Sequence, residues 1–439
     1  MIKKMLKIMF VMVLAISIGI PAAKASSTDM NSDKDPTLNT HDVEKAFSLA
    51  QDILTNYYQV TDIGTEEFAG KSFDTSLLDS ELSKYVEQKI KTKQYVTKAG
   101  DAEKENYTLK FTVLSSEVTK KGVLLSISTE AAFNYVGLKV ESGFGEISNM
   151  FFKDTGEGFT LTDWYMPYQY YDEFVRGVVD NSSQLFPNSI SADSNFSTLA
   201  DSNFSMLQEE LHDNVVKNLF STDQLAPEQE SDSAEESTHE TLSVSATLRS
   251  LNKQNIVTWA RNNMVVNPKS GNGVVPYYDF SKINNAWDCT NFVSHALLAG
   301  GAVVYDTGGT GISSTGWYYR STSNRSSSWT GVPNLHAFLT GNRTKGPAGT
   351  SITYRTFDWF GTRPYEAGDI MQFYLSGSYN NWRHSTIITE FYEVGSTPNH
   401  VGALVTGRSA AGSYNNNQKA HTIYEGDAKR VIKLSGYYN

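Results

Sequence analysis

Alternation between apolar and polar positions divides the chain into two patterned regions separated by a polar one. In the first region, apolar side chains recur at helical spacing after Thr40, and again from Ser76 to about Tyr95. Four strand-like segments follow, and a turn at 154–158 predicts a hairpin between the last two: 107–113, 123–129, 147–153 and 159–165. Two helices followed by an antiparallel sheet predict an α+β domain at about 41–182.

Residues 183–247 lack this patterning. The segment 192–197 repeats as 200–205, and the stretch 227–241 is acidic, rich in serine and free of aromatic residues. Such a composition cannot bury enough apolar surface to order itself. We interpret 183–247 as an acidic, Ser-rich linker that joins two independent units, the second of which spans 248–439.

The clearest helix of the second unit lies at 288–301. Asp288 is a suitable N-cap residue, and Gly300-Gly301 ends the pattern where a left-handed C-cap is needed. Between them, apolar positions at i, i+3, i+4, i+7 and i+8 form a single face: Cys289, Phe292, Val293, Ala296 and Leu297. Cys289 therefore lies in the first turn of a helix that docks on a core.

Cys289 is the only cysteine in the chain. The partial positive charge of a helix N-terminus favours a thiolate, so this position predicts a thiol with a lowered pKa, as a nucleophile requires. The alternative is a buried structural thiol that fills a core position, which is the more common role of a lone cysteine.

The segment Asp288-Cys289-Thr290-Asn291-Phe292-Val293-Ser294, followed by Gly300-Gly301, resembles the signature of the bacterial "putative amidase domain" family. That family is grouped with the papain-like and NlpC/P60-type cysteine hydrolases. The resemblance covers about 248–439, and shorter matches follow in the same order: Trp259-Ala260, Asn267-Pro268, Trp317-Tyr318-Tyr319, Ser328-Trp329-Thr330, Gly368-Asp369-Ile370 and His384-Ser385. It implies a papain-like α+β domain in which a cysteine helix packs on an antiparallel sheet.

The resemblance also implies that Cys289 is the nucleophile and His384 the base. Strands are expected at 369–373, 383–389 and 401–406, which places His384 at the start of a strand. Where the family often has a second histidine, this chain has Gly407-Arg408-Ser409, so the group that orients His384 stays open. Strand pairing favours Ser409 or Arg408, while His421 and residues 415–417 are alternatives. Asp288 and Asn291 fall in the cap or oxyanion region, where the backbone N–H of Cys289 is the expected oxyanion donor.

The remaining candidate groups favour structural roles. His295 lies about 240° around the helix from Cys289 and cannot face the thiol. His336, His400 and His421 lack the spacing of a metal site, and we expect no metal and no cofactor. Trp317 and Trp329 fit either a groove or the core.

In the first unit, we expect the aromatic residues to form a core: Phe144, Phe151, Phe152, Trp164 and Tyr165. Its element order is similar to that of domains resembling nuclear transport factor 2, which suggests a binding or spacing module.

Residues 1–25 have the pattern of a secretory signal peptide, with lysines before an apolar run and a small-x-small site at 23–25. A flexible N-terminus is expected at 26–40, and no membrane attachment after signal removal. The formal net charge of −11 with scattered basic residues argues against nucleic acid as a partner.

Together these features predict a secreted or cell-wall-associated cysteine amidase acting on cell-wall or other peptide substrates. The alternatives are a peptidase or transpeptidase with the same residues, and a non-catalytic binding protein that keeps the fold.

Overall fold

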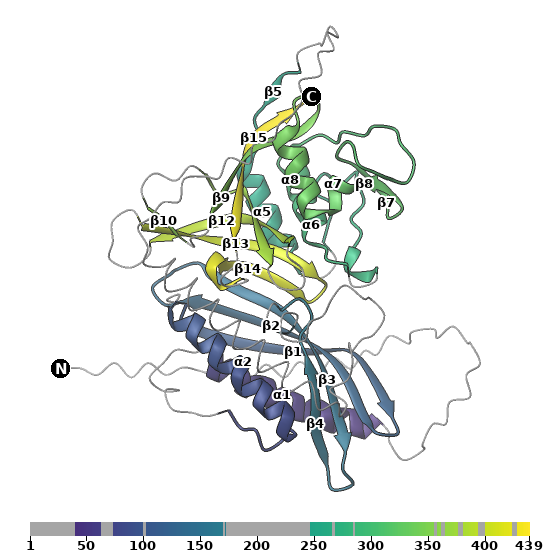
Figure 1. Ribbon diagram of the computed structural model, residues 1–439, viewed down its shortest axis with the longest axis vertical. Coiled ribbons are helices and arrows are strands. Elements are labelled where there is room, and N and C mark those ends of the chain that lie inside the picture. The colour runs from purple at the N-terminus through teal and green to yellow at the C-terminus, as the bar shows by residue number, and fades with distance from the viewer. Residues whose placement is uncertain are drawn as a thin grey trace, which may run out of the picture.

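The computed structural model of the protein is shown in Figure 1. It describes residues 40–62, 73–99, 102–169, 172, 246–265, 268–283, 286–354, 358–360, 365–375, 381–393, 400–423 and 428–439. The expected signal peptide, the repeat at 192–197 and 200–205, and nearly all of the expected linker lie outside these ranges. No helix in the described part of the chain is both long enough and apolar enough to cross a membrane.

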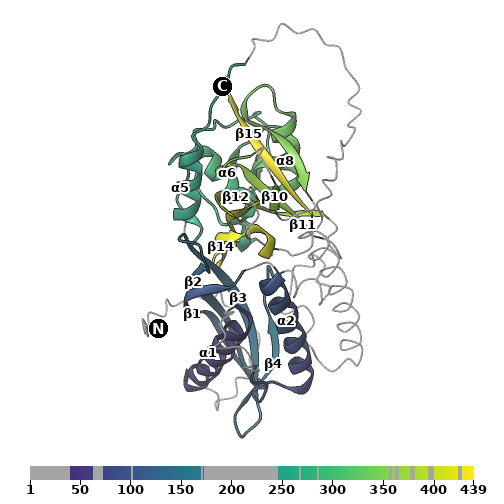
Figure 2. The ribbon, with the colours of Figure 1, turned by 90° about the vertical axis from the view of Figure 1, so that its left-hand side faces the viewer.

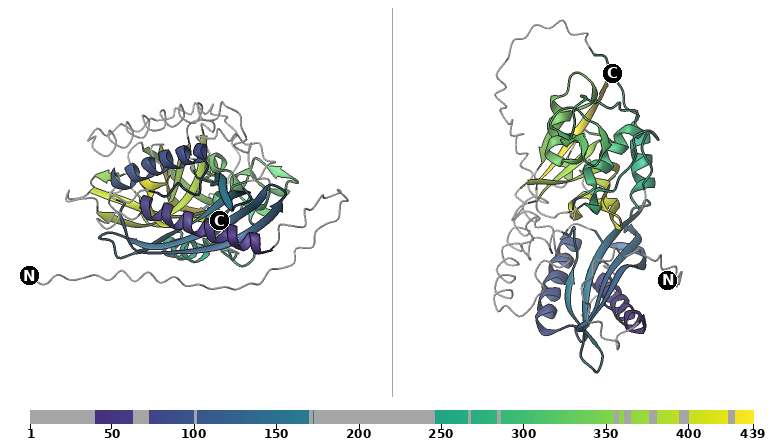
Figure 3. Two further views of the ribbon diagram at one scale, coloured as in Figure 1. Left: turned by 90° about the horizontal axis from the view of Figure 1, so that it is seen from below. Right: turned by 90° about the vertical axis from the view of Figure 1, so that its right-hand side faces the viewer.

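The N-terminal domain consists of two helices and an antiparallel sheet, as the sequence pattern predicts. Its elements are α1 (Thr40–Asp62), α2 (Ser80–Ala99), β1 (Lys104–Thr119), β2 (Gly122–Tyr135), β3 (Glu141–Asp154) and β4 (Phe159–Tyr165). The predicted hairpin between β3 and β4 is confirmed. α2 begins later than predicted because the side chain of Asp79 accepts the N–H of Leu82, at 2.8 Å, and so caps the helix. Seen from below, the two helices run side by side across the sheet (Figure 3).

The C-terminal domain packs helices against a second antiparallel sheet. Its helices are α5 (Lys253–Asn263), α6 (Cys289–Ala299), α7 (Ser327–Thr330) and α8 (Val332–Gly341), with 3-10 turns η1 (Phe280–Lys282) and η2 (Ala420–Thr422). Its larger sheet contains β5 (Leu248–Arg249), β9 (Gly346–Tyr354), β10 (Asp358–Phe360), β11 (Ile370–Leu375), β12 (Asn381–Glu393), β13 (His400–Ala410), β14 (Ser413–Lys419) and β15 (Lys429–Tyr438). A small sheet holds β6 (Ile312–Ser313), β7 (Tyr319–Ser321) and β8 (Asn324–Ser326).

The sheets of the two domains are hydrogen-bonded into one. The strand order is β1-β2-β3-β14-β13-β12-β11-β15-β5, and β14 joins the halves by pairing with β3, with Asn415 opposite Phe144. Gly145 permits the crossing, because a Cβ there would lie 2.4 Å from the ring of Tyr414. The domains stack end to end with β14 at the junction (Figures 1 and 2). The two expected units therefore share one sheet, and their independence in folding stays a prediction.

Asn417 strengthens this junction by bonding to both domains. Its Oδ1 accepts Arg261 Nε at 3.0 Å and Thr389 Oγ1 at 2.7 Å, both from the C-terminal domain. Its Nδ2 donates to the carbonyl of Glu141 at 2.9 Å, and its own carbonyl accepts Ser142 Oγ at 2.8 Å. Its φ of +46° is a conformation that asparagine tolerates better than most residues.

Two hydrophobic cores follow from this arrangement. One extends across the junction, from Phe133 and Phe144 to Phe373 and Leu404. The other surrounds α6 and includes Trp259 and other aromatic residues. The fold is α+β with a large antiparallel sheet. Its assignment as papain-like, and that of the N-terminal domain as related to nuclear transport factor 2, stay predictions.

Candidate active site

The cysteine helix α6 begins at Cys289 and ends in a Schellman motif. The N–H of Ala302 donates to the carbonyl of Leu297, and that of Gly301 to Leu298, both at 3.0 Å. Gly301 has φ +94°, which explains the glycine at that position. Every residue from 289 to 298 is buried, because α5, α7 and the sheet enclose the helix. The sequence predicted only one buried face.

Asp288 does not cap α6 through its side chain, contrary to expectation. Its carboxylate instead binds groups from the preceding loop and from β13. It accepts the N–H of Phe280 at 3.1 Å, Asn291 Nδ2 at 2.9 Å and Arg408 Nε at 3.1 Å, together with the hydroxyl of Tyr277. Burial raises the pKa of Asp288 to about 7, while the Arg408 guanidinium acts in the opposite direction. This carboxylate therefore fixes the approach of the chain to Cys289.

The thiol of Cys289 lies against the backbone of β12. Its Sγ donates to the carbonyl of Arg383 at 3.7 Å and accepts a hydrogen bond from the N–H of Ser385. These residues come immediately before and after His384, so the fold brings the two predicted catalytic positions together although 95 residues separate them. Next to the thiol, Thr290 Oγ1 and Ser385 Oγ are 3.3 Å apart and connect α6 to β12.

The thiol is not poised as a thiolate in this closed arrangement. Only 1% of Cys289 is exposed, and burial raises the pKa of its thiol to about 11. The N–H of Ser385 and the hydroxyl of Thr290 favour the thiolate but do not offset the loss of water. The expected low pKa is therefore wrong here, because the sequence showed the helix end but not the depth of burial.

His384 is fully buried on β12, between aromatic rings. Its imidazole lies 5.9 Å from the ring of Phe373 and 5.8 Å from that of Trp287, measured between centroids. Burial lowers the pKa of His384 to about 3, against an opposing effect of the Asn415 side chain. The imidazole is therefore neutral at ordinary pH, and the same burial makes it a weak base in this closed arrangement.

Asn415 is the side chain that the structure brings to His384. It lies on β14 opposite Gly407 of β13, and its Nδ2 donates to Gln418 Oε1 at 2.7 Å. That bond leaves Asn415 Oδ1 as an acceptor for an imidazole N–H. Gly407 lies between the two strands, and a Cβ there would lie 2.7 Å from Thr386 Cγ2 and 3.4 Å from His384 Nε2. The sequence left residues 415–417 only as an alternative for this role.

The other candidates for orienting His384 have different partners. Arg408 is fully buried and donates to Asp288, to Asp279 and to the carbonyls of residues 264 and 265. The carbonyl of Ser409 accepts the N–H of Asp288 at 2.8 Å. His421 Nδ1 lies 3.1 Å from the hydroxyl of Tyr392. Arg408 and Ser409 thus hold the segment before the cysteine.

Other polar and aromatic groups on α6 and around it belong to the packing of this helix. Asn291 Nδ2 donates to the carbonyl of Tyr278, and its Oδ1 accepts Trp329 Nε1 at 2.7 Å. His295 is buried against the rings of Trp259, Tyr277 and Trp329, and burial lowers its pKa to about 3. Trp317 and Trp329 are both 0% exposed, which places them in the core rather than along a groove.

Trp287 and Tyr168 cover the site from outside. Trp287 is half-buried in the loop before α6, and its ring contacts His384 and the guanidinium of Arg383. Tyr168, from the N-terminal domain, packs edge-on against Trp287 with centroids 5.7 Å apart. Both domains thus contribute to the enclosure of His384.

Comparison with known proteins supports a hydrolase in this region. Residues 250–434 match the family described as "Putative amidase domain". The match covers less than half of the chain and includes Cys289, His384 and Asn415. No curated protein and no solved structure matches the chain. The C-terminal region thus has the features of an amidase domain, and the N-terminal domain lies outside the match.

Proposed function

We propose that the protein is an exported cysteine amidase that hydrolyses an amide bond through an acyl-thioester. The observation that carries this proposal is the position of Cys289 Sγ, in the first turn of α6 and against the backbone on both sides of His384. Asn415 beside the imidazole completes a Cys–His–Asn arrangement of the kind that papain-like proteases use. The match to an amidase family supports the same reaction.

The chemistry follows from a neutral thiol and a neutral imidazole. As Cys289 Sγ attacks the amide carbon, His384 takes the thiol proton and the carbonyl electrons move to oxygen. The N–H of Cys289, at the helix start, is suited to stabilise that oxyanion. When the C–N bond breaks, the imidazolium gives its proton to the leaving amine. His384 then deprotonates a water that attacks the thioester, which releases a carboxylic acid and restores the thiol.

Substrate must reach a buried thiol, so the cover formed by Trp287 has to move. Movement of the loop that carries Trp287 would expose His384, since this half-buried ring contacts the imidazole. Peptide stems or cross-bridges of peptidoglycan are the substrate class that fits an exported amidase. Two alternatives remain: a peptidase or transpeptidase with the same residues, and a non-catalytic binding protein that keeps the fold.

The test is hydrolysis of cell-wall material by the full-length protein, with mass analysis of the products. Cys289→Ser and His384→Asn should each abolish product formation and leave the melting temperature within a few degrees of the parent value. His336→Asn is the matched control, because His336 is another neutral imidazole, with its pKa lowered to about 4, and it lies on α8 away from the dyad. It should retain activity.

The outcomes separate the alternatives. Products joined to an added amine would favour a transpeptidase. Retention of wall material without products, unchanged by Cys289→Ser, would favour the binding protein and contradict the amidase. Because the thiol is closed in, iodoacetamide labelling of the single cysteine should be slow in the native protein at pH 6 and should speed up when substrate opens the site.

A further inference from the structure

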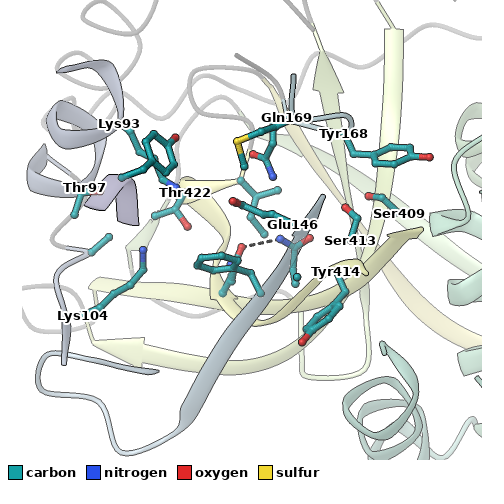
Figure 4. A pocket seen from close by; sticks show the side chains of 18 of the residues that line it. Lys93, Thr97, Lys104, Glu146, Tyr168, Gln169, Ser409, Ser413, Tyr414 and Thr422 are labelled. Atoms are coloured by element: carbon teal, nitrogen blue, oxygen red, sulfur yellow. Dashed lines mark hydrogen bonds between the residues drawn. The ribbon is translucent and has the colours of Figure 1, made fainter. Parts of the chain in front are cut away.

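A cavity of about 90 Å³ lies at the junction of the two domains. Lys93, Lys104 and Glu146 line it from the N-terminal domain, and Ser409 and Asn415 from the C-terminal domain. In Figure 4 the two lysines stand on one side, Ser409 and Tyr168 on the other, and Glu146 between them. A cavity of this volume exceeds what one water molecule needs by several times, which leaves room for a small ligand.

The charged side chains that face the cavity are predominantly cationic: three lysines, Lys89, Lys93 and Lys104, and one carboxylate, Glu146. The counter-charges lie behind them. Asp172 pairs with Lys89, while Asp62 is shared by Lys104 at 3.0 Å and Lys93 at 3.4 Å.

Lys93 is the most adaptable of the three lysines. About 19% of its side chain is exposed, compared with 3% for Lys89 and 9% for Lys104. Its ammonium group shares its carboxylate with Lys104 and lies over the rings of Tyr57, Tyr58 and Phe144. An anion that entered the cavity could bind this ammonium group, and Asp62 would still keep Lys104 as its ion-pair partner.

The walls of the cavity lead directly to the dyad. Asn415 lines it and approaches His384. Ser409 lines it and holds the N–H of Asp288, the residue before Cys289. Tyr168 lines it and packs on Trp287, the cover of His384. A group bound here is therefore one side chain away from the reacting atoms.

We propose that this cavity binds a carboxylate-bearing N-acyl amino acid portion of the substrate, so that the N-terminal domain supplies part of the specificity of the amidase. The lysines match the carboxylate, and Glu146 matches the amide N–H of the same group. Glu146 disfavours a phosphate, which carries more negative charge and offers no N–H. The proposal rests on the proposed amidase function for its link to catalysis, but not for binding itself.

The test uses full-length Cys289→Ala protein, which cannot turn over, and calorimetric titration with N-acetylalanine and N-acetylalaninamide as probes. Both enantiomers are used, since the handedness of the substrate is open. The acid should bind at least about tenfold more tightly than the amide, because only the acid has a charge for the lysines. Equal affinity for acid and amide would overturn the proposal.

Lys93→Met in the same background should weaken binding of the acid at least fivefold and leave binding of the amide unchanged. Lys91→Met is the matched control, because Lys91 lies two residues away on α2 and is exposed. It should bind like the parent, and melting temperatures of both variants confirm folding. Full acid affinity in Lys93→Met would also overturn the proposal.

The two proposals fail in different experiments. Preferential acid binding that depends on Lys93, with no hydrolysis by the parent protein, would retain the cavity site and reject the amidase. Hydrolysis that depends on Cys289 but no preference for the acid would do the reverse.

Discussion

Replacement of Arg408 by methionine tests how the segment before Cys289 is held. Arg408 is 0% exposed, and its guanidinium binds Asp288 at 3.1 Å, Asp279 at 2.7 Å and two backbone carbonyls. Methionine keeps an unbranched apolar side chain but removes every donor. The carboxylate of Asp288, also 0% exposed, then still accepts the N–H of Phe280 and Asn291 Nδ2 but has lost the guanidinium beside it.

Removal of one partner from a buried ion pair costs about 3–5 kcal/mol, because the remaining charge stays out of water. For a domain of roughly 150–250 residues, that corresponds to a melting temperature lower by about 6–20 °C. Arg320→Met is the control. Arg320 forms an ion pair with Asp306 at 2.6 Å, but both side chains are more than 30% exposed, so water screens the pair and its removal should change the melting temperature little.

The loss of stability in Arg408→Met should be greater at pH 8 than at pH 6. Arg408 lowers the pKa of Asp288, so in Arg408→Met this pKa should rise above the parent's value of about 7. The folded variant then binds more protons than the unfolded chain, and its stability falls as the pH rises through the folded pKa. Asp288→Asn should recover part of the loss in Arg408→Met, as a double-mutant cycle would show.

The measurement is a set of thermal melts at pH 6 and pH 8, followed by tryptophan fluorescence, of the four proteins of the cycle and of Arg320→Met. The reasoning would be refuted if, at both pH values, Arg408→Met melted as close to the parent temperature as Arg320→Met does. It would mean that Asp288 is not held as a charged group by Arg408.

Two further predictions concern the buried histidine rings and the glycine on β13. Burial lowers the pKa of His295 from 6.5 to about 3, so between these pH values the unfolded chain binds more protons than the folded protein. The free energy of unfolding should therefore fall as the pH drops below 6.5, by roughly 1.4 kcal/mol per pH unit. His295→Phe should flatten the dependence of melting temperature on pH between 6.5 and 4, and an unchanged slope would contradict this. Gly407→Ala should cost about 1–3 kcal/mol and lower turnover, since its Cβ would lie 2.7 Å from Thr386 Cγ2 and 3.4 Å from His384 Nε2. Gly341→Ala, with open space around it, should do neither.

The sequence predicted the site best where local pattern and packing agree. The helix at 289–299 and the strand that carries His384 both follow from periodicity and turn residues. Their meeting did not follow from pattern alone, since it depends on the sheet into which β12 is built. The capping role of Asp288 failed for a related reason: a carboxylate that can bind a buried guanidinium gains more there than from one N–H.

The strand β14 shows what the sequence could not provide. Its sequence, Ser-Tyr-Asn-Asn-Asn-Gln-Lys, is polar and rich in asparagine, which is depleted in strands. It forms a strand because β13 pairs with one edge and β3 of the other domain with the opposite edge. β13 is joined to β14 by the short turn at 411–412, but β3 is distant in sequence. No local signal therefore marks the pairing of β14 with β3 or assigns a role to Asn415. The buried lysines of the junction were missed for the same reason.

The position of Asn415 links the arrangement of the domains to the chemistry. Asn415 pairs with Gly407 of the amidase region on one side and with Phe144 of the N-terminal domain on the other. Without the N-terminal domain, β14 would become a polar edge strand, and the residue beside His384 would lose half of its backbone support. The lysine-lined cavity opens at the same place. The N-terminal domain thus both completes the sheet behind His384 and borders the adjoining cavity, which is more contact with the candidate site than a spacer requires.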